Sequence, residues 1–207
     1  MKTEKPIHIV YFSDPVCSYC WGSEPIISRL KRERGDMFDI EYRMGGLMPD
    51  WSMFTGHPDG PAVVGKHWPE ASERIGFRID GSVWETDPPA SSYPPSIAFK
   101  AASLQGEAKG LEFYFIMREL LFHKRVNIAK RENLLRAAEE SGLNIQVFLR
   151  DLDGRGKELF EEDLRFAADL NVDLFPTYIM SSLSGKRARL AGFISYDKLS
   201  ATIDEIL

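Results

Sequence analysis

The sequence predicts an α/β protein in which sheet-forming segments at the two ends of the chain are separated by an inserted helical block. Two observations predict this class. Strand and helix patterns alternate at both ends, and strand patterns are almost missing between them. A chain of 207 residues with 43% hydrophobic residues can bury a core of this size. We expect segments 1–55 and 171–207 to form one domain and 56–170 to form the insertion.

The first segment has the pattern strand, helix, strand. A continuous β-branched and aromatic run over 7–12 is typical of a strand that is buried on both faces. A helix is expected over about 17–34, with Pro25 inside it removing one backbone hydrogen bond and kinking the axis. The second strand is expected over 38–44 and ends at two glycines.

From about residue 49, turn-rich stretches separate several helical patterns. The clearest helices are expected over 111–123, 131–141, 145–152 and 157–170. Their apolar spacings indicate packing, and we assign them no chemistry. Strands are expected again over 175–180 and 188–191, as an antiparallel hairpin followed by a last helix.

Composition and charge argue against two classes of partner. The formal net charge of -5 repels phosphate backbones, so we expect no nucleic acid. No stretch approaches the roughly 18 apolar residues of a membrane span, and the run over 7–12 is too short for a signal peptide. We therefore expect no membrane and a cytoplasmic location. Thiols stay reduced there, so a close cysteine pair is more often catalytic, redox-sensing or metal-binding than a structural bridge.

The chain has two cysteines, Cys17 and Cys20, and they are three residues apart. A helix that begins at Cys17 places its sulfur among unpaired backbone N–H groups, which favour the thiolate. Cys20 lies one turn later and is expected to turn inward, so Cys17 would exchange disulfides and Cys20 would resolve the mixed disulfide. Two alternatives stay open. One is a metal site, although the four histidines show no recognisable ligand spacing, and the other is a pair of unreactive core cysteines.

The neighbours of the cysteine pair have their own expected roles. Ser18 and Tyr19 offer hydroxyl groups but no positive charge. Asp14 is expected to cap the helix, although its carboxylate could instead point at the sulfur. Trp21 either packs against the helical insertion or presents an apolar surface to substrates.

Several stretches, in this order along the chain, resemble one known family. They are "DPVCSYCWG" at 14–22, "MGGLMP" at 44–49, "HWPEASERIGF" at 67–77, "YPPSIAFKAA" at 93–102, "AAEESGLN" at 137–144 and "FPTYIM" at 175–180. This set is similar to the DsbA-like branch of the thioredoxin fold, and within it to the cytosolic FrnE-like group of predicted protein-disulfide isomerases. The resemblance implies a thioredoxin-like fold with an inserted all-helical domain.

The resemblance also implies a site and an activity. Pro176 would be the cis proline that faces Cys17 and Cys20, and Phe175 would precede it where many relatives carry Val or Thr. The implied substrate-binding residues are Pro176, Phe175, Trp21, Ser18 and Tyr19. The implied activity is a thiol-disulfide oxidoreductase or isomerase, with a redox-active disulfide in place of a bound cofactor and glutathione as a candidate reductant.

The expected partners are proteins or peptides that carry disulfides or thiols. Two other functions remain open. Some relatives of this fold are adaptors that deliver a client to an ATP-dependent protease. Others, the kappa-class transferases and their isomerase relatives, use glutathione, but these carry serine at the position of Cys17.

Overall fold

The computed structural model describes residues 5–207, so the first four residues of the expected segment 1–55 lie outside it. A four-stranded sheet has the order β2-β1-β3-β4, with β1 parallel to β2 and β3 antiparallel to both β1 and β4. The strands are β1 (Ile7–Ser13), β2 (Phe38–Met44), β3 (Thr177–Ser182) and β4 (Arg187–Ala191). The two ends of the chain therefore share one sheet, and the predicted α/β class is confirmed.

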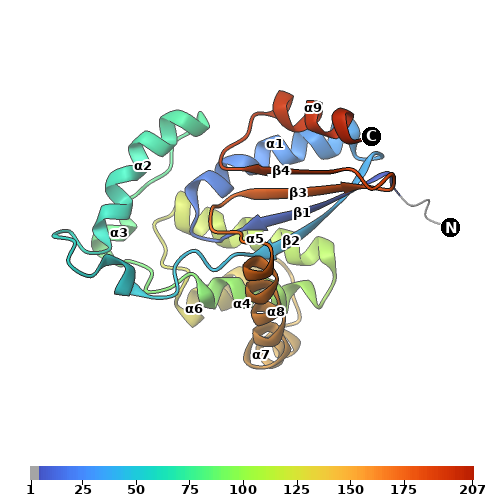
Figure 1. Cartoon of the computed structure of the whole chain (residues 1–207). Helices are drawn as coiled ribbons and strands as arrows, with labels where there is room; N and C mark the ends of the chain where they lie inside the picture. The colour runs from blue at the N-terminus through green and yellow to red at the C-terminus, as the bar shows by residue number, and fades with distance from the viewer. Residues whose placement is uncertain (1–4) are drawn as a thin grey trace.

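Helices make up the rest of the architecture. They are α1 (Ser18–Arg34), η1 (Trp51–Phe54), α2 (Ala62–Ile75), α3 (Val83–Thr86), α4 (Tyr93–Ser103), α5 (Glu107–Phe122), α6 (Arg131–Glu140), α7 (Ile145–Asp153), α8 (Arg155–Asp169) and α9 (Tyr196–Ile206). Helices α1 and α9 lie along the sheet, whereas α2 and α3 extend to one side of it (Figure 1). Among residues 5–207, no helix is both long and apolar enough to cross a membrane.

Strand β1 is buried on both faces, as its continuous apolar run predicts. Ile9 and Tyr11 belong to the large hydrophobic core beneath α1 and α9. Val10 and Phe12 face the other way, into a smaller cluster that includes Ala167 of α8. This alternation follows from the two-residue period of a strand, and it places helices on both faces of the central strand.

The hairpin begins two residues later than the sequence predicts. Strand β3 starts at Thr177, and Phe175 and Pro176 lie in the preceding loop. The physical reason is that Pro176 has no N–H to donate to a ladder. Its carbonyl still accepts a hydrogen bond from Gly192 N at 2.7 Å, which holds the loop to the end of β4.

Helix α2 reaches back to the first part of α1. A Cβ atom on Gly22 would lie 2.4 Å from Cγ2 of Ile75, so the two helices touch at a point where only glycine fits. Nearby, the ring centroids of Trp21 and Phe77 are 6.4 Å apart. The helical insertion therefore packs directly on the helix that follows the cysteine pair.

A buried carboxylate joins the sheet to the helical insertion. Asp163 of α8 is completely buried. It accepts hydrogen bonds from Arg43 Nη1 at 2.8 Å and from Met44 N at 2.9 Å, and Lys100 Nζ of α4 lies 2.8 Å away. The carboxylate thus pairs with two cations that are largely shielded from water, and one of them, Arg43, also pairs with Glu41.

We predict that Asp163→Asn lowers the free energy of unfolding by about 3 kcal/mol, because Lys100 loses its buried counter-charge and Arg43 keeps only Glu41. Urea denaturation measures the change. The matched control is Asp153→Asn, which removes an exposed ion pair with Arg131 and should change stability far less, because exposed ion pairs contribute little. Equal losses in the two variants would contradict the assigned role of Asp163.

Candidate redox site

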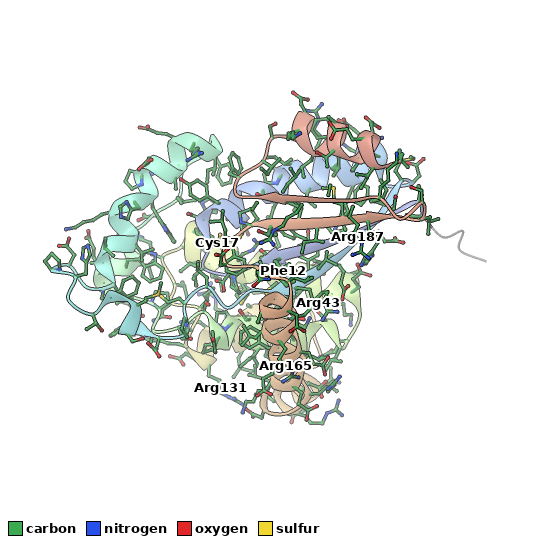
Figure 2. The ribbon with its side chains drawn as sticks, viewed as in Figure 1. Phe12, Cys17, Arg43, Arg131, Arg165 and Arg187 are labelled. Atoms are coloured by element: carbon green, nitrogen blue, oxygen red, sulfur yellow. The ribbon has the colours of Figure 1, made fainter. Side chains whose placement is uncertain are left out.

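Cys17 caps the helix that begins beside the sheet. Its backbone is extended, and its Sγ accepts a hydrogen bond from Cys20 N at 3.1 Å. Figure 2 shows Cys17 beside the end of the sheet, far from Arg187 at the start of β4. The sulfur therefore occupies the position at the helix N-terminus where backbone N–H groups have no carbonyl partner.

The two cysteines differ in exposure. Cys17 is 6% exposed and Cys20 is 0% exposed, and both are free thiols in this structure. Burial, followed by the hydrogen bond and the charge of Cys17, raises the pKa of the Cys20 thiol well above its ordinary value. The order of exposure agrees with the expectation that Cys20 turns inward, and Cys17 has a small opening to solvent.

The loop before β3 faces the cysteine pair. The peptide bond between Phe175 and Pro176 is cis, as the family resemblance implies. The Cys17 thiol points to the carbonyl oxygen of Phe175, with 3.7 Å between sulfur and oxygen. The guanidinium of Arg189 holds the start of this loop through the carbonyls of Leu170 and Asn171, at 2.9 and 2.7 Å.

Gly45 makes room for the Phe175 side chain. A Cβ atom at this position would lie 1.8 Å from Cε1 of the Phe175 ring. Gly45 N also donates to Ser13 O at 2.8 Å, which continues the pairing of β2 with β1. The end of the parallel β1–β2 pair thus limits where the Phe175 ring, next to the cis proline, can lie. Gly45 belongs to the "MGGLMP" stretch, but the sequence carries no local signal for this steric role.

The expectation that Asp14 caps α1 is wrong. Its Oδ1 accepts a hydrogen bond from Val16 N at 3.0 Å, and its Oδ2 accepts from Leu47 N and from Ser92 Oγ, both at 2.8 Å. Cys17 itself takes the capping position, because its sulfur is the acceptor for Cys20 N. The hydrogen bonds of the Asp14 carboxylate instead link three separate segments of the chain close to the cysteine pair.

The residues between and after the cysteines lie in different surroundings. Ser18 and Tyr19 are half-buried. The Tyr19 ring lies between Phe193, with centroids 6.2 Å apart, and the Arg74 guanidinium, at 5.6 Å. A cation on α2 therefore lies over the ring of the second residue of the CxxC dipeptide.

Trp21 is 5% exposed and packs among aromatic side chains. Its ring is stacked on Phe122, with centroids 5.5 Å apart, and lies beside Phe115 at 5.2 Å and His123 at 5.7 Å. These contacts favour the packing role that the sequence left open. Trp21 also borders a hollow in the surface.

A cluster of tyrosine side chains lies next to Cys20. The hydroxyl of Tyr11 donates to the Cys20 carbonyl at 3.4 Å. The Tyr11 ring is stacked on Tyr178 and meets Tyr42 edge to face, with centroids 4.8 and 5.1 Å apart. Burial raises the pKa of Tyr11 well above its ordinary value, so the phenol stays neutral.

Within residues 5–207, no three His, Cys, Asp or Glu side chains are grouped as metal ligands.

The sheet has the features of a thioredoxin fold: a parallel strand pair, a CxxC pair at a helix N-terminus, a facing cis proline and an antiparallel hairpin. The helices inserted between β2 and β3 place the chain in the DsbA-like class of that fold. The comparisons agree with this class. The chain belongs to the Thioredoxin_5 family, described as thioredoxin, whose model matches residues 11–200.

Among curated relatives, the ClpXP adapter protein SpxH of Halalkalibacterium halodurans is 36% identical over 182 residues, which cover 86% of this chain and 60% of that protein. The chain thus spans about three fifths of that relative's length. A solved structure from Nitrosomonas europaea, described as a candidate protein disulfide isomerase, aligns with a TM-score of 0.82 at 20% identity over 98% of this chain and 97% of that one. The cytosolic disulfide reductase DsbM of Pseudomonas aeruginosa aligns with a TM-score of 0.69 at 20% identity over 96% and 94%.

We predict that Gly45→Ala lowers the free energy of unfolding by about 1 to 3 kcal/mol, because the added methyl group overlaps the Phe175 ring. Urea denaturation of Gly45→Ala, of Phe175→Leu and of the double variant gives the coupling between the two positions. The double variant should lose less stability than the sum of the single variants. Strictly additive losses would show that the ring does not limit residue 45.

A second prediction concerns pH. Burial raises the pKa of the Asp14 carboxyl to about 6, against the opposing effect of its hydrogen bonds. The folded protein therefore holds this proton more tightly than the unfolded chain does. The resulting stability is fully present below about pH 4 and is lost as the pH rises through 6.

The native chain should therefore lose about 2 kcal/mol more stability than Asp14→Asn between pH 4 and pH 7. Urea denaturation of both proteins across this range measures the difference. Parallel pH profiles would mean that the folded-state pKa of Asp14 is ordinary.

Proposed function

We propose that the protein is a thiol-disulfide oxidoreductase in which Cys17 attacks a disulfide and Cys20 resolves the product. The observation that carries this proposal is the position of the Cys17 sulfur. It accepts a hydrogen bond from Cys20 N and faces the Phe175 carbonyl in the loop of the cis proline. A thiolate at this position is stabilised by the helix N-terminus.

The exchange has two steps. The Cys17 thiolate attacks one sulfur of a client disulfide, forms a mixed disulfide and releases the other client sulfur as a thiolate. The Cys20 thiol then loses its proton and attacks Cys17 Sγ. This step forms the Cys17–Cys20 disulfide and releases the client as a dithiol. The burial that raises the pKa of Cys20 keeps this cysteine protonated until the mixed disulfide has formed.

Two glutathione molecules, or another small thiol, would return the pair to the dithiol and become oxidised themselves. A structure of DsbM has been solved with GSH, which supports this choice of reductant. In the reducing cytoplasm, the dithiol form favours reduction or isomerisation of clients over net oxidation.

Insulin reduction by the native chain, with glutathione as the electron source, tests the proposal. We expect turnover in the native chain, none in Cys17→Ser, and a stable mixed disulfide between client and Cys17 in Cys20→Ser. A matched control is Leu183→Ser, which changes an exposed residue on the β3–β4 turn, keeps both thiols and should retain turnover. Equal rates in the native chain and Cys17→Ser would falsify the proposal.

An adaptor function is a second candidate. Its support is the similarity to SpxH, a protein named as a ClpXP adapter. Apolar side chains near the cysteine pair, Leu47 at 38% and Leu174 at 52% exposed, also suit protein contacts. Client binding that is equal in the native chain and Cys17→Ser, with no turnover in either, would favour the adaptor.

A further inference from the structure

Three hollows on the surface lie next to one another. The largest, of about 670 Å³, lies along the outer edge of β2. It shares Lys31, Tyr42 and Leu111 with a second hollow of about 280 Å³ between α1 and α5. The second shares Glu24 and Phe115 with a third, of about 310 Å³, that ends at Trp21. The three hollows therefore adjoin in a row from the sheet edge to the helix that carries the cysteines, and we call this row the trench.

Strand β2 offers free backbone groups to this trench. Gly45 N bonds to Ser13 O across the β1–β2 pair, so the odd-numbered residues of β2 turn their backbone groups to β1. The even-numbered residues face outward, because Phe38 O accepts from Lys5 and Met44 N donates to Asp163.

These two contacts block the ends of the outer edge. The backbone groups of Ile40 and Tyr42 lie between them and have no hydrogen-bond partner among residues 5–207. A short unpaired length of strand edge can accept one more strand.

Helices α1 and α5 form the walls beyond the strand edge. From Lys31 to Trp21, α1 rises about 15 Å along the trench. An extended chain advances about 3.3 Å per residue, so four or five residues fit in this length. The trench is thus better matched to a polypeptide segment than to a small molecule.

The middle of the trench combines an exposed aromatic ring with unpaired acidic groups. Phe115 is 46% exposed and lies against Trp21. Glu112 and Glu119 lie one turn of α5 to either side of Phe115, and each lines one of the hollows. Neither carboxylate forms an ion pair with the described part of the chain.

Glu24 does not add to this charge, because Arg118 Nη2 lies 2.7 Å from its Oε1. The unpaired Lys31 stands near Glu107, which also lines the trench. The net charge on the side of α5 that lines the trench is therefore negative, which is complementary to a cationic segment.

We propose that this trench binds an extended, basic polypeptide segment of a partner protein. The segment pairs its backbone with Ile40 and Tyr42, seats an apolar side chain against Phe115 and Trp21, and places cationic side chains by Glu112 and Glu119. The proposal does not depend on redox activity, because Cys17 faces the loop of Phe175, whereas Trp21 belongs to a separate cluster.

Fluorescence anisotropy with a labelled, end-blocked hexapeptide, Arg-Val-Phe-Val-Arg-Val, tests the proposal. We expect Phe115→Ser and the double variant Glu112→Lys/Glu119→Lys each to weaken binding about tenfold or more. Leu183→Ser, which changes an even more exposed apolar residue on the β3–β4 turn, should bind as the native chain does. Cys17→Ser should also bind normally, which separates this site from the redox proposal.

Two peptide controls test the chemistry of the segment. The acidic peptide Glu-Val-Phe-Val-Glu-Val should bind at least about tenfold more weakly, and so should the basic peptide with methylated backbone nitrogens. Near-UV circular dichroism verifies that each variant is folded.

Three results would overturn the proposal. The first is the absence of binding by the basic peptide, and the second is equal binding by the acidic one. The third is a concentration-dependent dimer, seen by analytical ultracentrifugation, that Phe115→Ser abolishes. That result would identify a second copy of this chain as the occupant.

Discussion

The carboxylate of Asp14 is the interaction on which the rest of the site depends. It is fully buried, and its three hydrogen bonds join the loop before α1, the segment after β2 and the start of α4. These segments come from both the sheet and the helical insertion. A buried carboxyl group that lost these donors would carry a large desolvation cost. The geometry of the cysteine pair is therefore linked to the packing of the whole insertion.

Both cysteines are almost completely shielded from solvent, and only Cys17 has a small exposed surface. Cys17 touches the Phe175 carbonyl, and Cys20 rests on neutral tyrosines. An environment of this kind admits a client chain that can replace the Phe175 contact, and it keeps bulk water from the second sulfur. Under the proposed exchange reaction, access to Cys17 would therefore limit which client disulfides react.

The sequence predicts the elements well where the signal is local. The run over 7–12 is a buried strand, the helix around Pro25 forms, and the cysteines lie at its start. Contacts between distant segments leave no such signal. The three donors of Asp14 and the close approach of Gly45 to Phe175 depend on which segments the fold brings together. The cis form of Pro176 was expected only from the family resemblance, because an X-Pro bond is cis in about 5% of cases.

The contact between Gly22 and Ile75 has a consequence for protein engineering. A side chain at residue 22 would overlap the Ile75 side chain of α2, so α1 and the first long helix of the insertion are fitted to each other. A chimera that replaced only the insertion would keep this close approach only if the incoming helix left the same space above residue 22.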